Sequence, residues 1–140
     1  MSEIKFVDVY PPRLLLTTFL YHVLHERAPE QSISHKEMPT FDQHRAFVER
    51  RPYKFWYLIQ VDTEPVGSIY LTEQNEIGVF ILKEHRSRGH GTRAIKLLMQ
   101  THPQEQFLAN INPNNAKSLA LFEGLEFRLL QLTMVSRSPK

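Results

Sequence analysis

A short basic stretch with two glycines, residues 86–91, stands between an apolar run and an apolar-periodic segment. Gly89 and Gly91 let the backbone turn tightly and approach a ligand with no Cβ in between. The first N–H groups of a following helix point at such a ligand, and the helix dipole favours negative charge there. Arg86 and Arg88 add positive charge nearby. The order of strand, basic glycine loop and helix therefore predicts a site for phosphate groups.

Two common nucleotide-binding motifs compete with this interpretation. The P-loop is excluded, because its Gly-x-x-x-x-Gly-Lys-Ser/Thr pattern occurs nowhere in the chain. Residues 89–94 do fit the dinucleotide pattern Gly-x-Gly-x-x-Gly/Ala. In that design, however, the first glycine directly follows the strand, and an acidic residue comes about twenty positions later. Here residues 83–88 separate the apolar run from Gly89, and residues 109–112 contain no acid, so a Rossmann-type domain is less favoured.

The pattern Arg86-x-x-Gly89-x-Gly91 resembles the acyl-CoA pyrophosphate loop of the GNAT superfamily of N-acetyltransferases. Residues 111–127 resemble the second signature of that superfamily, an Asn-x-x-Ser/Ala helix that runs into an aromatic residue, a Gly-Phe pair and a final strand. One helix and one strand separate the two blocks, as in the superfamily. The resemblance extends from residue 54 to the end of the chain, and the residues before it match only in kind.

The resemblance implies that acetyl-CoA is the cofactor and that its acetyl group passes to a primary amine. Backbone N–H groups of the strand before the loop would bind the pantetheine arm and polarise the thioester carbonyl. The loop would hold the pyrophosphate, and two asparagines and an aromatic residue would lie beside the cofactor arm. The cofactor-binding residues implied in this way are Val79, Phe80, Ile81, Arg86, Ser87, Arg88, Gly89, His90, Gly91, Thr92, Asn112, Asn115 and Phe122.

Three residues compete for the role of general base. Glu76 stands near the place where some members of the superfamily keep a glutamate that deprotonates the amine through water. His35 and His44 are rivals, because imidazole titrates near neutral pH and both lie in the segment that shapes the substrate pocket in the superfamily. A structural role is the alternative for each of the three. His22 and His25 have no carboxylate cluster beside them, so we expect no metal site.

Two positions depart from the superfamily pattern. Many members place a tyrosine in the last helix to protonate the leaving thiolate, and the matching residue here is Phe122, which has no proton to give. The Gly-Phe pair reads Glu126-Phe127. Water, another residue or unaided departure would replace the phenol, since a thiol pKa near about 8.5 makes the thiolate a tolerable leaving group. A non-catalytic acyl-CoA-binding or regulatory module is the alternative from another functional class.

The segment 33–56 mixes aromatic and basic residues and is expected to select the acceptor. Arginines suit phosphate groups and aromatic rings suit the face of a base or sugar, so the mixture favours an amino-sugar nucleotide or another small anionic amine. The segment also loosely resembles that of amino-sugar nucleotide acetyltransferases. A protein N-terminus, a lysine side chain or a polyamine is the alternative acceptor. The residues concerned are His35, Glu37, His44, Arg45, Arg50, Arg51, Tyr53 and Trp56.

Composition agrees with a single domain over residues 1–140, with 41% hydrophobic residues to build one core. The chain has no cysteine, which excludes disulfides and a cysteine nucleophile. No apolar run approaches the length of a membrane span, and no signal-peptide pattern opens the chain, so we expect a cytoplasmic protein. The net charge of +2 is too balanced to favour nucleic acid as a partner. A homodimer is compatible with these features.

Hydrophobic periodicity and turn residues predict a mixed α/β domain, whose central sheet is mostly antiparallel and is flanked by about four helices. The resemblance adds that the sheet splays between its fourth and fifth strands. Predicted strands cover residues 4–10, 54–61, 65–71, 76–82, 106–111 and 127–135. Predicted helices cover residues 13–26, 41–50, 92–99 and 114–124, with Thr40 as a cap and Leu15 in an inward-facing stripe. Gly78, inside a strand pattern, indicates a bulge or a close backbone approach.

Overall fold

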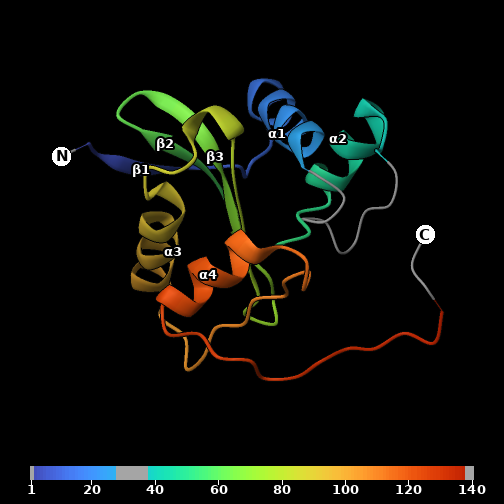
Figure 1. The fold of residues 1–140 in the computed structure, drawn as a ribbon. Helices are drawn as coiled ribbons and strands as arrows, with labels where there is room; N and C mark the ends of the chain where they lie inside the picture. Colours follow the sequence, from blue (N-terminus) through green and yellow to red (C-terminus); the bar gives the residue numbers. More distant parts are fainter. Residues whose placement is uncertain (1, 28–37, 138–140) are drawn as a thin grey trace.

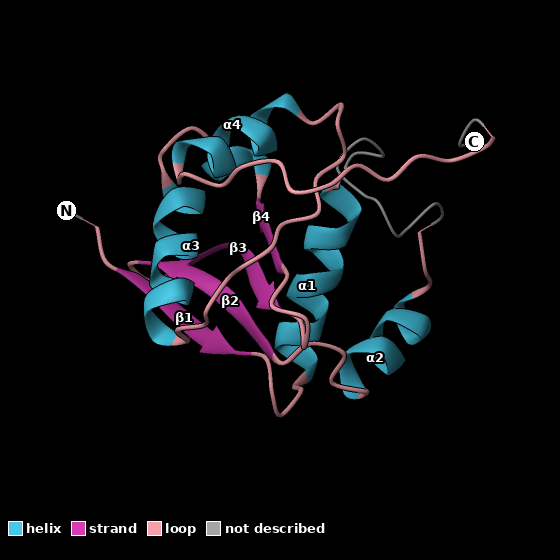
Figure 2. Cartoon of the chain, turned by 90° about the horizontal axis from the view of Figure 1, so that it is seen from below, coloured by secondary structure: helices cyan, strands magenta, loops and turns pink. Residues whose placement is uncertain are grey.

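The computed structural model describes residues 2–27 and 38–137, and its centre is a four-stranded antiparallel sheet between two helical layers (Figures 1 and 2). The strands follow the order of the chain: β1 (Ile4–Asp8), β2 (Phe55–Val61), β3 (Glu64–Leu71) and β4 (Ile77–Ile81). Helices α1 (Leu14–Glu26) and α2 (Phe41–Glu49) lie against one face of the sheet. Helices α3 (His90–Thr101) and α4 (Ala116–Gly124) lie against the other, and a short 3-10 turn, η2 (Lys83–His85), follows β4. The predicted fold class is confirmed.

Each face of the sheet carries its own hydrophobic core, because successive side chains of a strand point to opposite faces. The face toward α3 and α4 is the larger core, built on Ile59, Ile69, Leu71 and Ile77 with Leu98 of α3. The face toward α1 and α2 buries a second cluster of four residues: Val9, Leu20, Val48 and Trp56. The helical layers thus cover both faces of the sheet, and β4 is one of its two edge strands.

Local signals set several element ends as predicted. Thr40 caps α2 in a capping box: Thr40 Oγ1 accepts a hydrogen bond from the Gln43 amide at 3.1 Å, and the Thr40 amide donates to Gln43 Oε1 at 2.9 Å. The hairpin between β2 and β3 turns at Asp62, whose φ of 57° is the left-handed conformation that aspartate tolerates. Each of these two element ends depends on residues that lie within four positions of one another, so the sequence pattern is enough to identify it.

The inward stripe predicted for α1 is right at Leu20 and Val23, which are buried, and wrong at its first residue. Leu15 is 84% exposed, whereas Leu16 is 8% exposed and Thr17 is buried with it. Thr17 Oγ1 donates to the carbonyl of Arg13 at 2.9 Å, which satisfies its hydroxyl inside the layer. Leu14, Leu15 and Leu16 are three equivalent leucines in a row, so only the packing of α1 on the sheet decides which of them is buried.

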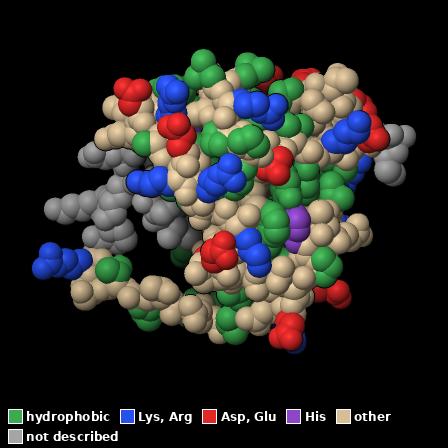
Figure 3. All heavy atoms as spheres, turned by 180° about the vertical axis from the view of Figure 1, so that it is seen from behind, with side chains coloured by type: hydrophobic (Ala, Val, Ile, Leu, Met, Phe, Trp, Pro, Cys, Tyr) green, Lys and Arg blue, Asp and Glu red, His purple; other side chains and the backbone are tan. Residues whose placement is uncertain are grey.

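The fifth and sixth strands are not formed as predicted. Of residues 106–111, only Leu108 pairs with the sheet, in a single parallel bridge with Glu76. Residues 127–135 form no strand, and they run clear of the body of the domain (Figures 1 and 3). Leu129, Leu132 and Met134 are 75–90% exposed. The composition of this segment favours a strand, but a strand needs a paired neighbour and the described chain supplies none.

Helix α4 ends in a Schellman motif around a left-handed Glu126. The Phe127 amide donates to the carbonyl of Phe122 and the Glu126 amide to that of Glu123, both at 3.0 Å. The rings of Phe122 and Phe127 meet edge to face with centroids 5.0 Å apart, which is the apolar contact that usually accompanies this motif. Glu126 has a φ of 70°. The superfamily glycine that the sequence lacks is therefore replaced by a strained glutamate at a position that favours glycine.

The described residues lack two features that would define other classes of protein, a membrane-spanning helix and a metal-binding cluster. None of their helices has the length and apolar character needed to cross a membrane. Among the same residues, no group of three or more His, Asp or Glu side chains is placed to hold a metal ion. On the face shown in Figure 3, acidic and basic side chains are interspersed rather than gathered in fields of one sign.

Candidate active site

The loop between β4 and α3 has the geometry expected for a phosphate site. Gly89 precedes α3 with a φ of 80°, and Ser87 also adopts a left-handed φ of 64°. No side chain caps the start of α3, so the N–H groups of its first turn are left for another acceptor. A Cβ added at Gly89 would meet nothing within 4 Å, which shows that the backbone faces open space there. This cradle fits the pyrophosphate of an acyl-CoA.

The two arginines of the loop differ in their contacts: Arg86 binds the end of β4, and Arg88 is exposed to solvent. Arg86 Nε donates to the carbonyl of Ile81 at 2.9 Å, and its guanidinium lies 4.9 Å from the ring centroid of Phe80. Arg86 therefore ties the loop back to the end of β4. Arg88 is exposed and stays a predicted phosphate contact, together with the backbone of Ser87, Gly91 and Thr92.

His90 is the first residue of α3, and its side chain is buried at the start of the helix. Burial lowers the pKa of His90, and the charges of Arg93 and Arg88 lower it further. A neutral ring suits this position, because a charged imidazolium would have to be desolvated beside two guanidinium groups. An anion bound at the start of α3 would oppose this shift, so cofactor binding and protonation of His90 are expected to be coupled.

The outer edge of β4 presents free backbone groups next to this loop. Antiparallel pairs alternate between hydrogen-bonded and non-hydrogen-bonded, and the bonds from Thr72 N to Glu76 O (2.9 Å) and from Leu82 N to Val66 O (2.8 Å) fix the phase. The backbone of Phe80, opposite Ser68, therefore faces β3, whereas those of Val79 and Ile81 face outward. Of the three residues predicted to bind the pantetheine arm through their backbone, Val79 and Ile81 are correctly oriented and Phe80 is not.

The splay beside β4 is anchored at one end only. Ile77 N donates to Leu108 O at 2.8 Å, and Leu108 N donates to Asn75 O at 2.9 Å. Glu76 reinforces this junction, because its Oε1 accepts from Thr72 Oγ1 at 3.1 Å and its Oε2 accepts from Asn110 Nδ2 at 2.6 Å. Beyond this point no described strand pairs with β4 on that side. The outer edge of β4 is therefore unpaired along Val79 and Ile81, where a pantetheine arm could add its amides as a strand would. We use the term V for this edge together with residues 108–112, which leave it after the bridge at Leu108.

The polar residues of the α4 signature are engaged in local hydrogen bonds. Asn115 Oδ1 accepts from the Ser118 amide at 3.1 Å and caps α4. Asn112 Oδ1 accepts from the Asn114 amide at 2.9 Å. Phe122 is 4% exposed and belongs to the larger core. Phe122 therefore packs inside the domain, and contacts of the two asparagines with a cofactor stay a prediction.

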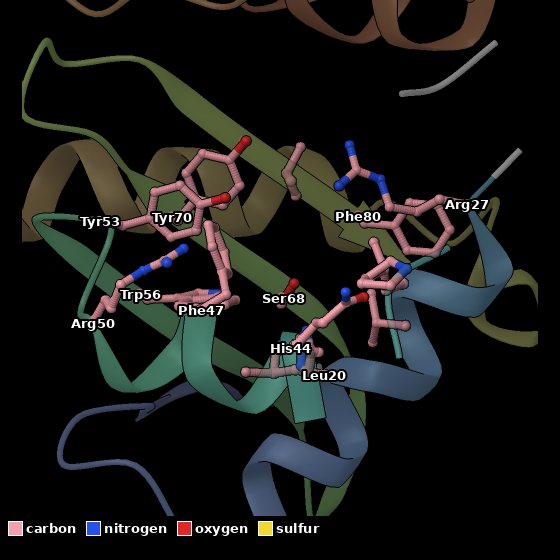
Figure 4. Close-up of a pocket in the computed structure, with 16 residues that line it drawn as sticks. Leu20, Arg27, His44, Phe47, Arg50, Tyr53, Trp56, Ser68, Tyr70 and Phe80 are labelled. Carbon is pink, nitrogen blue, oxygen red and sulfur yellow. The ribbon is translucent and has the colours of Figure 1, made fainter. Parts of the chain in front are cut away.

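A cavity of about 280 Å³ lies on the opposite face of the sheet, between α1, α2 and the strands β2–β4 (Figure 4). Tyr53, Tyr70, Trp56 and Phe47 form an aromatic end, and the other end lies between Arg27 and Phe80. Its wall includes Val79, so the cavity reaches β4 at the residue whose backbone faces the V. The remaining lining residues are Leu20, Val23, Leu24, Pro39, Gln43, His44, Arg50, Ser68 and Gly78.

The aromatic end of the cavity is built from stacked and edge-on rings. The rings of Tyr53 and Tyr70 are parallel, with an interplanar angle of 2° and centroids 3.7 Å apart. Trp56 meets the edge of Tyr53 at 4.8 Å. The Tyr53 backbone makes two hydrogen bonds with the Tyr10 hydroxyl. This hydroxyl donates to Tyr53 O and accepts from Tyr53 N, each at 3.1 Å. This end is therefore rigid and flat.

Gly78 makes room for a side chain of the neighbouring strand, and the bulge predicted at Gly78 is wrong. A close approach of the cofactor to its backbone stays a prediction. The pairing of β3 with β4 runs without a register shift, and the one irregularity lies between Ile59 and Gln60. A Cβ at Gly78 would overlap Cζ and the hydroxyl of Tyr70, its cross-strand partner. The missing side chain of Gly78 thus makes room for the Tyr70 ring to lie across β4.

The structure separates the residues predicted to select the acceptor. His44, Arg50, Tyr53 and Trp56 line the cavity, whereas Arg45 forms an ion pair with Glu49 on the outside of α2. His35 and Glu37 fall outside the described residues. Glu76 is absent from the lining, and both of its carboxylate oxygens are engaged at the root of the V.

The lining residues that the sequence interpretation missed include three with polar groups, Arg27, Ser68 and Tyr70. Arg27 comes from the end of a helix, and the other two come from a strand treated only as part of a hairpin. The signal that could have found Tyr70 is the hairpin register, which places a large aromatic side chain opposite a glycine. For Arg27 the sequence carries no such signal.

Comparison with known proteins identifies the family. The model of the acetyltransferase (GNAT) family matches residues 19–127, well over half of the chain, and the chain therefore belongs to this family. Acetyl-CoA is the donor that the family uses. A search among curated proteins finds no match.

Solved structures show the same fold at low sequence identity. A domain from Methanocaldococcus jannaschii is 23% identical, with a TM-score of 0.73 over 91% of this chain and 90% of that one. An acetyltransferase from Thermus thermophilus is 20% identical, with a TM-score of 0.71 over 94% and 92% of the two chains. The Salmonella typhimurium protein yncA, solved with its cofactor acetyl-CoA, is 18% identical, with a TM-score of 0.63 over 89% and 78%.

Proposed function

We propose that this acetyltransferase N-acetylates a small primary amine that carries an anionic group. One observation carries the proposal: the cavity on the α1–α2 face and the V on the edge of β4 meet at Val79. An amine in the cavity and a thioester held along β4 would therefore approach each other there. Acetyl-CoA supplies the acetyl thioester, and in the transfer a C–N bond forms, the C–S bond breaks with its electron pair on sulfur, and the amine loses one proton.

The charge of the lining supports an anionic acceptor. Arg27 and Arg50 line the cavity, and its described lining contains no aspartate or glutamate. A polyamine would bring two or more positive charges to this wall without a carboxylate to receive them, which is unfavourable in a partly desolvated site. A carboxylate or phosphate on the acceptor would instead pair with a guanidinium.

The size and aromatic character of the cavity restrict the rest of the acceptor. A volume of about 280 Å³ holds a molecule of amino-acid or monosaccharide size, and the flat wall of Tyr53 and Tyr70 suits an apolar or sugar face. A nucleotide attached to an amino sugar would have to extend past the cavity toward exposed Arg50. A protein N-terminus or a lysine side chain stays the alternative acceptor, and a cytoplasmic location and a homodimer stay predictions.

We assign the general base to His44 rather than Glu76. His44 is 5% exposed and lines the cavity at the start of α2, where its ring also packs on Tyr21 with centroids 5.3 Å apart. Imidazole is suited to accept the amine proton near neutral pH. Glu76 supports the junction at the root of the V from outside the cavity.

The burial of Phe122 favours the second candidate function, a non-catalytic acyl-CoA-binding module. No phenol stands on α4 at this position to protonate a leaving thiolate, and the Phe122 side chain lies in the core. The two functions differ in one measurable respect, which is release of free CoA when an amine is added.

The test is a thiol-release assay with acetyl-CoA and a matched panel of amines. Phenylalanine and phenethylamine differ only in the carboxylate, glucosamine 6-phosphate and glucosamine only in the phosphate. Spermidine, a UDP-linked amino sugar and a peptide with a free N-terminus complete the panel. We expect the anionic member of each pair to react at least tenfold faster. Binding of acetyl-CoA without thiol release on any amine would instead support the non-catalytic module.

A further inference from the structure

We propose that the Tyr70 hydroxyl donates a hydrogen bond to the thioester oxygen and forms, with the Val79 N–H, a two-donor oxyanion hole. This assignment rests on the proposed function for its catalytic meaning, but the contact itself concerns only bound acetyl-CoA. Tyr70 lies on β3, outside both the loop and the α4 signature.

The position of the Tyr70 hydroxyl is fixed by Gly78. The hydroxyl lies where the Gly78 side chain would begin, so it sits directly above β4 on the cavity side. Val79 is the next residue, and neighbouring Cα atoms are about 3.8 Å apart. Because the Val79 N–H faces the open edge of β4, one oxygen at that edge can approach both donors.

The surrounding rings hold the Tyr70 side chain in this place. Tyr53 stacks on it at 3.7 Å, and the Tyr53 backbone is in turn bonded to the Tyr10 hydroxyl. Such preorganisation is what an oxyanion hole needs, because a donor that must be reoriented during the reaction loses much of its benefit.

Together the two groups would stabilise the charge that develops on the carbonyl oxygen as the amine attacks. Removing one donor of an oxyanion hole typically lowers kcat by about 100-fold to 1,000-fold. The effect on the KM for the amine should be small, because this donor acts on the thioester and not on the acceptor.

The experiment compares Tyr70→Phe with the wild type by two independent measurements. The first is the infrared carbonyl stretch of bound ¹³C-labelled acetyl-CoA, which shifts to lower frequency when donors polarise the carbonyl. The second is kcat and KM with the best amine of the panel. Tyr57→Phe is the matched control, since Tyr57 lies on the same sheet with its side chain on the α3 face, bonded to His102 at 2.7 Å.

We expect Tyr70→Phe to lose a measurable part of the infrared shift and about 100-fold in kcat, with the dissociation constant of CoA unchanged. Tyr57→Phe should change neither. Gly78→Ala removes the hydroxyl from its place without deleting it and should reproduce the loss. An unchanged carbonyl stretch in Tyr70→Phe overturns the proposal, whether or not the wild type turns over. A wild type with the shift but without thiol release on any amine overturns only the proposed function.

Discussion

The Glu76 carboxylate accepts a hydrogen bond from the Asn110 side-chain amide at 2.6 Å, across a separation of 34 residues in the sequence. This bond closes the root of the V, where the segment after α3 returns to β4. The other carboxylate oxygen of Glu76 accepts a hydrogen bond from Thr72 Oγ1 at 3.1 Å. A residue first considered as the general base thus holds together the two walls between which the cofactor arm is expected to lie.

Glu76→Gln tests whether Glu76 acts as the general base or as a structural residue at the root of the V. The amide keeps one acceptor but turns an N–H group toward a donor, so we expect a loss of about 1 kcal/mol in the free energy of unfolding. The pH profile of kcat/KM should keep its shape. His44→Asn should instead cost about 100-fold or more and remove the ionisation on the acidic limb. A hundredfold loss in Glu76→Gln, with a moved profile, would return Glu76 to the mechanism.

Gly89→Glu should abolish binding of acetyl-CoA, measured by calorimetry. Its φ of 80° costs a side-chain residue about 1 kcal/mol, and the carboxylate would repel the pyrophosphate at the start of α3. Gly124→Glu, in α4 and outside the loop, is the control, because a Cβ at Gly124 would also meet nothing within 4 Å. Normal affinity in a folded Gly89→Glu protein would remove the loop from the cofactor site.

Because Phe122 matches the position of the superfamily tyrosine, Phe122→Tyr would place a phenol there, but the burial of Phe122 keeps this phenol from the cofactor arm. A hydroxyl placed in this core without a partner should lower the free energy of unfolding by about 1–3 kcal/mol. Turnover per folded molecule should stay unchanged. Urea unfolding and the thiol-release assay measure the two quantities, and a stable variant with faster turnover would show that the side chain reaches the V.

Glu126→Gly should stabilise the protein by about 1 kcal/mol. Glu126 is strained at a φ of 70°, and glycine adopts this conformation without a Cβ penalty. The Schellman bonds of α4 involve only the backbone, so they survive the change. Urea unfolding measures the effect, with Glu123→Gly, inside α4, as a control expected to lose stability. A destabilised Glu126→Gly protein would mean that the Glu126 side chain has an unrecognised partner.

Stability should fall as the pH drops below about 6.5, the usual pKa of histidine in an unfolded chain. Burial lowers the pKa of His102, which stacks on Phe55 with centroids 3.5 Å apart, and nearby Lys54 lowers it further. The unfolded chain therefore takes up a proton at a higher pH than the folded one, and the loss ends once the pH is below the folded pKa. His102→Gln should lose less free energy of unfolding between pH 7.5 and 5.5 than the wild type. An equally steep loss would show that His102 contributes nothing.

The sequence by itself determined the features that depend on residues close together in the chain. The glycine loop, the caps at Thr40 and Asn115 and the order of helices and strands follow from local hydrogen bonds and hydrophobic periodicity. The family resemblance followed from two such local blocks. In each case the interacting groups lie within a few residues, so their spacing is enough to identify them.

Tertiary structure alone decided the features that depend on distant residues. The register of β3 on β4 turned Val79 outward and Phe80 inward, and it placed Tyr70 over Gly78. The packing of α1 brought Arg27 to the cavity. The composition of residues 127–135 predicted a strand that does not form, because pairing requires a free neighbour that only the folded sheet can supply. The sequence gives the chemistry of each side chain. Long-range packing decides which of these side chains lie together in a cavity.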